Sequence, residues 1–358
     1  MSSQPREVRE PVFGDVLAAS RVVSRFLDVT PVVASPRLGE RVRLKLETLQ
    51  PTGSFKVRGA LAALGALAAL DKVGAGRDQR VVTASAGNHG LGIAYAARML
   101  GVGATIVVPE TASSAKVQAL QELSGRAVGN GAVSNRAVSD TEPGAIEVVR
   151  HGQSYDDAEV FALELAGSLQ DQGGRFVSAY NDPDVIAGQG TIALELLEQV
   201  PDTETIVAPV GGGGLLAGLC LALATSRGTR VCGVEPEASA AVSEAVAAGR
   251  IVEIREQPTI ADGLAGNLEA GSVTVPIISR HVSRLVRIGE GPIRDAVRFL
   301  ALEHGLVVEP SGAAAVGAVM GGLVEPSGGS TVVVVTGRNV SPALVVELLG
   351  PFGGDSRR

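Results

Sequence analysis

The side chains best suited to chemistry are a lysine, a polar turn containing a histidine, a run of four glycines and a threonine that ends an apolar run. Lys56 stands at the start of an alanine-rich segment that predicts a helix. The positive end of the helix dipole disfavours a lysine there, so Lys56 is either exposed and without effect or placed for chemistry. A desolvated lysine has a lowered pKa and forms a Schiff base with a carbonyl compound. The local sequence leaves both interpretations open.

Hydroxyl, amide and imidazole groups meet in the segment SAGNHG, at Ser85, Asn88 and His89. The segment lies between a predicted strand and a predicted helix, so backbone N–H groups at the helix start join them. Such a turn binds an anion and suits a carboxylate. The alternative is an ordinary helix cap made by Ser85 or Asn88.

Four consecutive glycines follow a predicted strand and precede Leu215 and a predicted helix; they are Gly211, Gly212, Gly213 and Gly214. Glycines let the backbone curl around a phosphate and point N–H groups at it. A flexible turn is the alternative, but four glycines opening a helix cost more stability than a turn requires. The run fits neither a Walker loop nor a dinucleotide fingerprint. We therefore predict a phosphate site.

Thr336 ends the run VVVV and brings a hydroxyl group to the end of a predicted strand, where it either meets a ligand or caps the next turn. Runs rich in β-branched residues alternate with alanine- and leucine-rich runs from residue 80 onward, which predicts an α/β fold with parallel sheets. The predicted strands are 81–84, 104–109, 146–149, 175–180, 205–210, 230–234 and 331–336. The predicted helices include 88–100, 115–124, 155–170 and 215–224. Ligands bind at the carboxyl ends of such strands.

Composition narrows the class of protein. A length of 358 residues predicts two lobes, and 45% hydrophobic residues exclude wholesale disorder. A net charge of -7 and 3% aromatic residues argue against nucleic-acid binding. No apolar stretch predicts a membrane span, and the first residues do not resemble a signal peptide, so we expect the cytoplasm. Cys220 and Cys232 are too few for a disulfide scaffold or a cysteine zinc cluster. The polar segment 126–144 predicts a loop insertion on the face opposite the ligand.

Taken together, the segments PTGSFKVRGA, SAGNHGLGIAYAA, VIAGQGTIALELLEQ, APVGGGGLLAG and VVEPSGAAAVGA resemble the fold-type II pyridoxal-phosphate enzymes. Within that family the chain is similar to the threonine/serine dehydratase and serine racemase group. The resemblance implies a tryptophan synthase β-like fold with two open, twisted, parallel-type sheets flanked by helices. It implies a large cofactor-binding domain (1–77 and 183–358) and a small domain (78–182). It also implies pyridoxal 5'-phosphate, a small-molecule amino-acid substrate and a homodimer.

The resemblance assigns roles to single residues. Lys56 resembles the Schiff-base lysine, Phe55 the residue beside the cofactor ring, and Asn88 the amide that donates to the 3'-oxygen. The four glycines and the N–H of Leu215 resemble the phosphate cradle, and Thr336 the partner of the pyridine nitrogen. Three residues resemble the turn that binds the substrate carboxylate: Ser85, Asn88 and His89. Glu309 resembles a carboxylate near the ring.

The implied reaction is elimination of water from threonine, serine or a related hydroxy amino acid, giving a 2-oxo acid and ammonia. Racemases of the group carry a serine where this chain has Ala86, which favours a dehydratase. Against this, the segment EPSG that begins at Glu309 resembles the racemase and hydroxyaspartate-dehydratase branch. Metal-activated relatives bind a cation near a GVEP turn. Here Glu235 is present but Ala241 replaces the second acid, so Glu235 is either a lone metal ligand or a solvated loop acid.

Overall fold

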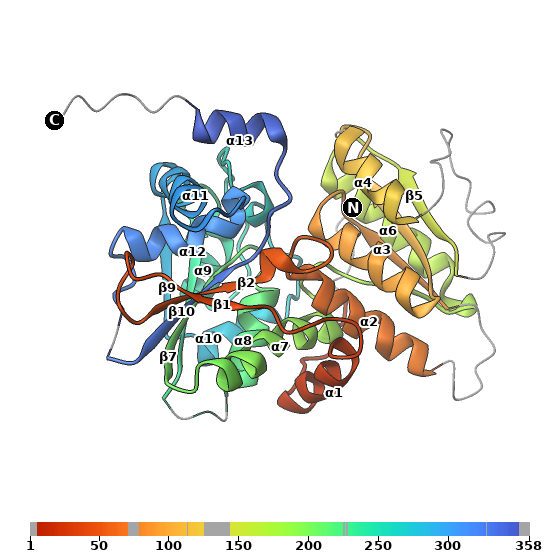
Figure 1. Cartoon of the computed structure of the whole chain (residues 1–358). Coiled ribbons are helices and arrows are strands. Elements are labelled where there is room, and N and C mark those ends of the chain that lie inside the picture. Colours follow the sequence, from red (N-terminus) through yellow and green to blue (C-terminus); the bar gives the residue numbers. More distant parts are fainter. Residues whose placement is uncertain are drawn as a thin grey trace.

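The structure, a computed structural model, describes residues 6–70, 79–112, 114–124, 144–224, 226, 228–326 and 328–350. Two sheets lie side by side, each flanked by helices (Figure 1). The larger sheet has the order β1-β2-β10-β7-β8-β9, and all its neighbours are parallel except the pair β1 and β2. Its strands are β1 (Val32–Ala34), β2 (Val42–Leu46), β7 (Thr203–Pro209), β8 (Arg230–Pro236), β9 (Arg284–Ile288) and β10 (Ser330–Val335).

The smaller sheet has the order β5-β4-β3-β6 and is wholly parallel. Its strands are β3 (Arg80–Ala84), β4 (Gly103–Val108), β5 (Ile146–Arg150) and β6 (Gly174–Phe176). The predicted α/β fold with two mostly parallel sheets is therefore confirmed. The predicted domain boundaries stay a prediction, and the predicted insertion at 126–144 lies outside the described residues except for Gly144.

Helix α2 (Lys56–Leu70) connects the two sheets, because it packs against α3 (Asn88–Leu100) on one side and α7 (Pro183–Gln199) on the other (Figure 1). The other α-helices are α1 (Phe13–Val23), α4 (Ser114–Ser124), α6 (Tyr155–Ser168), α8 (Gly214–Leu223), α9 (Ala241–Ala248), α10 (Thr274–His281), α11 (Glu290–His304), α12 (Pro310–Met320) and α13 (Pro342–Leu349). Helix α2 is therefore held from both sides.

The apolar runs form the strands predicted from them. All six residues of β10 are buried, as expected for a strand that helices cover on both faces. The strand predicted at 175–180 is wrong after its second residue, because β6 ends at Phe176. Beyond it the chain turns, and the Ser178 hydroxyl accepts a hydrogen bond from the Asn181 N–H at 3.2 Å. This turn leaves the sheet and lines the site described below.

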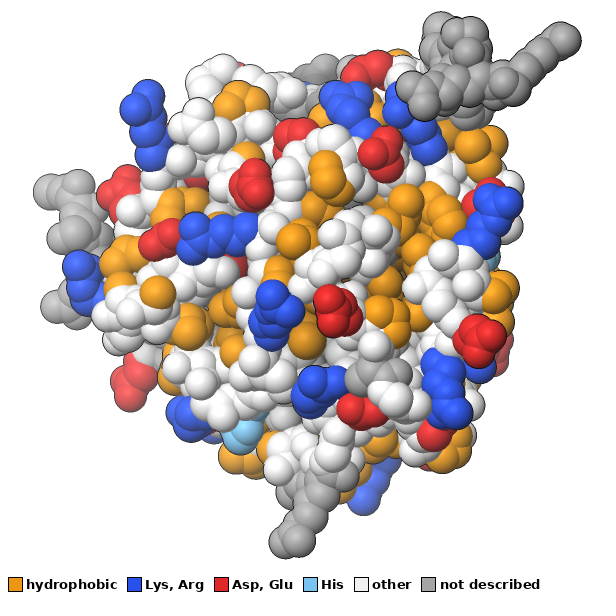
Figure 2. All heavy atoms as spheres, turned by 90° about the vertical axis from the view of Figure 1, so that its left-hand side faces the viewer, with side chains coloured by type: hydrophobic (Ala, Val, Ile, Leu, Met, Phe, Trp, Pro, Cys, Tyr) orange, Lys and Arg blue, Asp and Glu red, His pale blue; other side chains and the backbone are white. Residues whose placement is uncertain are grey.

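Acidic and basic side chains are interspersed on the face shown in Figure 2, with hydrophobic side chains between them. That face therefore carries no continuous basic stripe of the kind that binds a phosphate backbone. Among the described residues, no helix is both long enough and apolar enough to cross a membrane.

Candidate active site

Lys56 is the first residue of α2, and its side chain is half-buried, with its amine turned toward the turn after β6. The Nζ atom donates a hydrogen bond to the Ala179 carbonyl at 2.8 Å and lies 5.3 Å from the centre of the Phe55 ring. Burial lowers the pKa of Lys56 to about 8, and the negative charge of Glu309 opposes the shift. An amine with this pKa is about one-fifth neutral at pH 7.4, against about one in a thousand for an ordinary lysine, and the neutral form is the one required of a nucleophile or a base.

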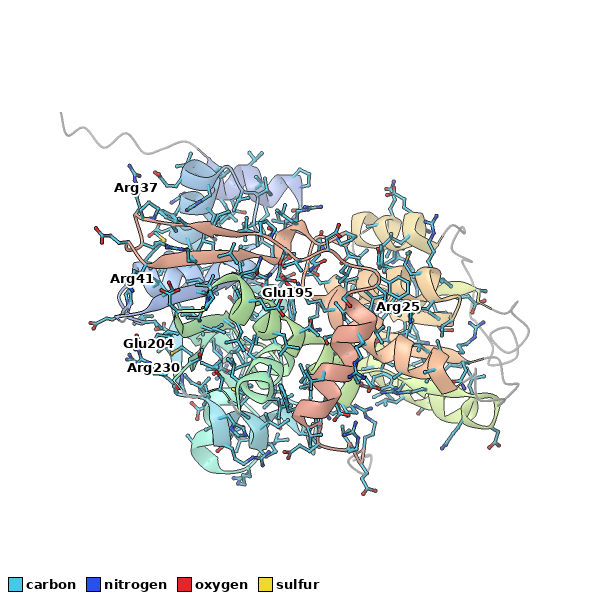
Figure 3. The ribbon with its side chains drawn as sticks, turned by 60° about the horizontal axis from the view of Figure 1, so that its bottom comes forward. Arg25, Arg37, Arg41, Glu195, Glu204 and Arg230 are labelled. Carbon is cyan, nitrogen blue, oxygen red and sulfur yellow. The ribbon has the colours of Figure 1, made fainter. Side chains whose placement is uncertain are left out.

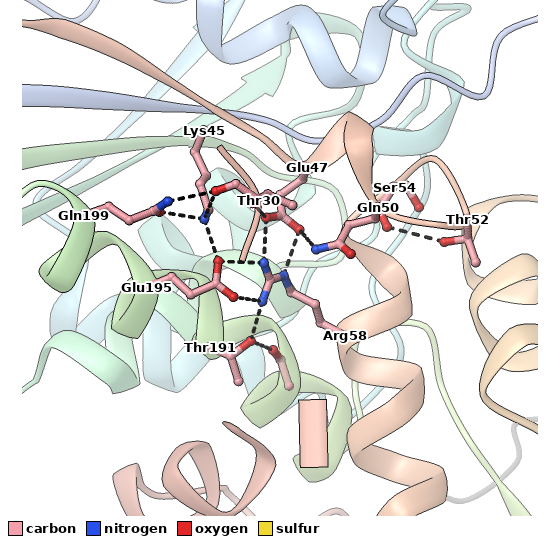
Figure 4. Close-up of polar contacts among 11 residues, drawn as sticks. Thr30, Lys45, Glu47, Gln50, Thr52, Ser54, Arg58, Thr191, Glu195 and Gln199 are labelled. Carbon is pink, nitrogen blue, oxygen red and sulfur yellow. Dashed lines mark hydrogen bonds and ion pairs between the residues drawn. The ribbon is translucent and has the colours of Figure 1, made fainter. Parts of the chain in front are cut away.

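A buried ion network holds the start of α2 in place (Figure 4). The Arg58 guanidinium makes two-pronged contacts with Glu47, at 2.8 and 2.8 Å, and with Glu195, at 2.6 and 2.9 Å. Lys45 donates to Glu195 at 2.5 Å. Burial alone would lower the pKa of Arg58, but the two carboxylates outweigh it and raise that pKa. Since Arg58 lies two residues after Lys56, the network fixes the helix turn that carries the amine.

The glycine run forms the turn between β7 and α8. A Cβ atom on Gly212 would lie 2.3 Å from Cγ of Tyr180, so a side chain there would have to displace the ring. Gly213 has a φ of 86°, in the left-handed region that favours glycine. The Thr274 hydroxyl donates to the Gly212 carbonyl at 2.9 Å and fixes the loop from outside. The helix behind it, α8, begins without a side-chain cap.

The turn after β6 joins the amine to the glycine loop, and the sequence did not predict it as part of the site. Ala179 accepts from Lys56, and the next residue, Tyr180, packs against Gly212. The Tyr180 hydroxyl accepts from the Glu269 N–H at 2.6 Å. Asn181 accepts from the Val273 N–H at 3.0 Å. The sequence signal that could have located this turn is the polar ending of the run at 175–180.

The end of β10 lies against the start of α2. The Thr336 carbonyl accepts from the Phe55 N–H at 3.0 Å, which places the predicted ring-nitrogen partner next to Lys56. Asn88, the first residue of α3, donates from Nδ2 to Glu309 at 2.8 Å. The structure therefore brings these predicted residues of distant segments to one place, from the large sheet and from the small sheet.

The SAGNHG turn is formed by β3 and α3, as predicted, but its histidine is oriented differently from expectation. The His89 side chain is only 2% exposed, and its Nε2 atom lies 3.3 Å from the Val177 carbonyl. Burial and the charge of Lys56 lower the pKa of His89 to about 3, so the imidazole is neutral. The imidazole is therefore part of the protein core. If His89 binds a carboxylate, it does so through its backbone N–H. The Ser85 hydroxyl accepts from the Gly87 N–H at 3.2 Å.

Three comparisons with known proteins bear on this arrangement. A family model described as pyridoxal-phosphate dependent enzyme matches residues 23–337. The chain belongs to this family. It is 35% identical over 311 residues to an L-threonine ammonia-lyase of Thermotoga maritima, which covers 86% of this chain and 70% of that protein. It is 37% identical over 306 residues to an L-threo-3-hydroxyaspartate ammonia-lyase of Saccharomyces cerevisiae, covering 84% and 85%. Maize serine racemase superposes with a TM-score of 0.80 at 28% identity, covering 95% and 97%.

The pyridoxal-phosphate family assignment agrees with the donor groups of the site. A phosphate suits the loop at Gly212 and Gly213, since a side chain is excluded there and the N–H groups at the start of α8 have no side-chain cap. An aldehyde suits the desolvated amine of Lys56. The residues present therefore fit the cofactor of the family.

Glu235 has a structural role in place of the metal role considered for it. Its carboxylate accepts from the Val242 and Ser243 N–H groups at 2.8 and 2.9 Å and from the Ser243 hydroxyl, and so caps the start of α9. The sequence alternative of a solvated loop acid is also wrong, because the residue is fully buried. Among the described residues no group of three or more potential ligands from His, Cys, Asp and Glu is assembled for a metal ion.

Proposed function

We propose that this protein is a pyridoxal-phosphate-dependent ammonia-lyase that removes water from a β-hydroxy amino acid. The products are a 2-oxo acid and ammonia, and the candidate substrates are L-threonine, L-serine and L-threo-3-hydroxyaspartate. The observation that carries the proposal is the Lys56 amine, which burial brings to a pKa of about 8. The charge of Glu309 acts on this amine. The amine donates a hydrogen bond to Ala179, and the next residue, Tyr180, packs with its ring against the glycine loop.

Lys56 is the proposed general base. When bound, pyridoxal phosphate withdraws electrons from the α-carbon of an attached amino acid and so acidifies its hydrogen. The neutral Nζ atom of Lys56 accepts that proton. Burial supplies enough neutral amine for this step, while Glu309 keeps the pKa near the operating pH. The network on Arg58 limits movement of the helix turn that carries the base.

The start of α3 is the proposed site for the substrate carboxylate. The helix begins after Gly87 without a side-chain cap, so the N–H groups of Asn88, His89 and Gly90 are suited to an anion. The Ser85 hydroxyl holds the Gly87 N–H and thereby orients the turn. These are backbone donors, and they recognise the group that all α-amino acids share. They therefore position the substrate without selecting its side chain.

Two residues favour elimination over other reactions. Thr336 offers a neutral hydroxyl group, where a carboxylate would stabilise a protonated ring nitrogen and a longer-lived carbanion, so it favours elimination over transamination. Ala86 favours elimination over racemisation, because it has no proton to give from the face opposite Lys56, which a racemase requires. The alternative is an amino-acid racemase, because serine racemase and aspartate racemase have the same fold. We also propose that the enzyme acts as a homodimer in the cytoplasm.

The test is a 2-oxo acid assay with L-threonine, L-serine and L-threo-3-hydroxyaspartate, with the cofactor-loaded protein and with Lys56→Ala. The wild type is expected to release 2-oxo acid and ammonia in equal amounts from at least one of them. Lys56→Ala is expected to lose turnover and to retain the wild-type melting curve. Steady turnover by folded Lys56→Ala, or no 2-oxo acid from any substrate, would contradict the proposal.

A further inference from the structure

A chain of hydrogen bonds through two asparagine amides links two of the motif segments at the site. Asn339 Nδ2 donates to the Thr52 carbonyl at 2.8 Å and to Asn88 Oδ1 at 2.5 Å. Asn88 Nδ2 in turn donates to Glu309 Oε1 at 2.8 Å. Asn339 follows β10 by four residues, whereas Asn88 begins α3 beside the smaller sheet. The contact therefore connects the two halves of the site.

The two ends of this chain fix the orientation of both amides. The Thr52 carbonyl only accepts hydrogen bonds, and so does the ionised carboxylate of Glu309. Asn339 must therefore present its NH2 group to the Thr52 carbonyl, and the same NH2 group also faces Asn88. Asn88 must then present its carbonyl to Asn339 and its NH2 group to Glu309. Rotating the Asn88 amide by half a turn would set NH2 against NH2 and carbonyl against carboxylate.

Two glycines in the motifs make room for these side chains. A Cβ atom on Gly53 would lie 2.5 Å from Asn339 Oδ1, and a Cβ atom on Gly337 would lie 2.0 Å from Glu309 Oε1. Real Cβ atoms do not approach other atoms so closely, so a side chain at either position would displace the amide or the carboxylate. The glycines of PTGSFK and TGRN are thus matched to the hydrogen-bond chain.

We propose that Asn339 is a positioning residue that holds the Asn88 amide with its NH2 group, rather than its carbonyl, toward the cofactor. This rests on the proposed function and on the role that the family resemblance implies for Asn88, whose amide donates to the 3'-oxygen of pyridoxal phosphate. That oxygen carries negative charge, so it is attracted by the NH2 group and repelled by the carbonyl. The Asn88 nitrogen carries two hydrogens, of which Glu309 takes one.

The test uses Asn339→Asp, which keeps the size of the side chain but only accepts hydrogen bonds. Asn88 then lies between the new carboxylate and that of Glu309, and whenever it turns its NH2 group to residue 339 its carbonyl faces the cofactor. The dissociation constant of the cofactor-free protein for pyridoxal phosphate, measured by titration of its visible absorbance, should rise about 10- to 100-fold. Asn339→Ala, which removes the donor without adding an acceptor, should raise it less. A role in packing alone would reverse this order, because alanine leaves the larger gap.

A double-mutant cycle separates the role of Asn339 from the added charge of the aspartate. In an Asn88→Ala background the same substitution at residue 339 should change the dissociation constant less than about threefold, since its effect acts through Asn88. Arg338→Ala is the control, because Arg338 is exposed and contacts the Thr48 carbonyl; it should bind like the wild type. If Asn339→Asp fails to fold, Asn339→Ala is compared in both backgrounds, where the same loss of effect is expected.

Wild-type affinity in folded Asn339→Asp would overturn the inference, and so would an undiminished effect in the Asn88→Ala background. If the wild type itself binds no pyridoxal phosphate, the proposed function fails first and the inference fails with it. Cofactor binding and 2-oxo acid release by the wild type, combined with unchanged affinity in both residue 339 variants, would overturn the inference alone.

Discussion

Replacing Glu195 by glutamine is expected to lower the melting temperature by about 4 °C. Glu195 lies in the interior on α7, where it contacts Arg58 at 2.6 and 2.9 Å and Lys45 at 2.5 Å (Figures 3 and 4). The network also contains Glu47, so the two positive charges of Arg58 and Lys45 are balanced by two negative charges. Glutamine has the same shape as glutamate but no charge, so the substitution leaves one uncompensated positive charge in the interior.

The magnitude follows from burial and chain length. Removing one partner of a buried ion pair costs about 3–5 kcal/mol. The Glu195 side chain is 16% exposed, whereas those of Arg58 and Lys45 are 0% exposed, so water relieves part of the cost and about 3 kcal/mol is expected. The entropy of unfolding is about 2.1 cal/mol/K per residue, or about 0.75 kcal/mol/K for this chain. Dividing the loss of about 3 kcal/mol by this entropy gives a decrease of about 4 °C in the melting temperature.

The assay is differential scanning calorimetry of the cofactor-free protein, with Glu303→Gln as the matched control. Glu303 pairs with Arg37, which lies at the edge of the molecule and has a side chain that is 70% exposed (Figure 3). Exposed pairs contribute about 0–1 kcal/mol, so the control should shift by about 1 °C or less. Equal shifts in the two variants would refute the view that the network holds α2 in place.

Three further predictions concern the site itself. In the cofactor-free protein the rate at which Lys56 reacts with pyridoxal phosphate should rise with pH to a plateau with a midpoint near 8, since only the neutral amine reacts. A rate that still rises above about pH 10, where an ordinary lysine titrates, would show that the amine is not desolvated. Gly212→Ala should weaken binding of pyridoxal phosphate at least about 10-fold, because its Cβ would meet the Tyr180 ring. Gly167→Ala, where nothing lies within 4 Å of the added Cβ, should leave the affinity unchanged, and equal affinities of the two variants in a titration of the visible absorbance would contradict the prediction. With L-serine the wild type should form pyruvate and little D-serine. Ala86→Ser should raise the share of D-serine, measured by chiral chromatography, by up to about 100-fold, which is the lower end of the rate increase that one general acid gives. Racemisation by the wild type as fast as elimination would contradict the dehydratase proposal.

The strands and the glycine loop could be predicted because their signals are local. A run such as that of β10 is apolar over all six residues and needs helices on both faces, whatever the rest of the chain does. Gly212 and Gly213 stand between a predicted strand and a predicted helix, so the place of the turn could be predicted, while its phosphate role stays a prediction. Strand β1 was not predicted because it has only three residues, and strands β2 and β9 were not predicted because they mix charged residues such as Arg43 and Arg287 with apolar ones.

The orientation of side chains could not be predicted, because it depends on contacts between distant segments. The sequence predicts His89 in the turn that binds the substrate carboxylate, but it does not predict that the ring lies in the core near the Val177 carbonyl, 88 residues away. Glu235 was considered for a metal, but the start of α9 takes its carboxylate. Tyr180 and Asn339 were not assigned to the site from the sequence, because only the packing of α2, α3 and β10 brings their side chains to it.

The most direct test of the account is to find which lysine holds the cofactor. The chain has four lysines, namely Lys45, Lys56, Lys72 and Lys116. The cofactor-loaded protein is reduced with borohydride, digested, and mapped by mass spectrometry for the pyridoxyl group. The label is expected on the peptide that contains Lys56, at close to one group per chain, and no label is expected after the same treatment of Lys56→Ala. A pyridoxyl group on another lysine of the wild type, or none at all, would contradict this expectation.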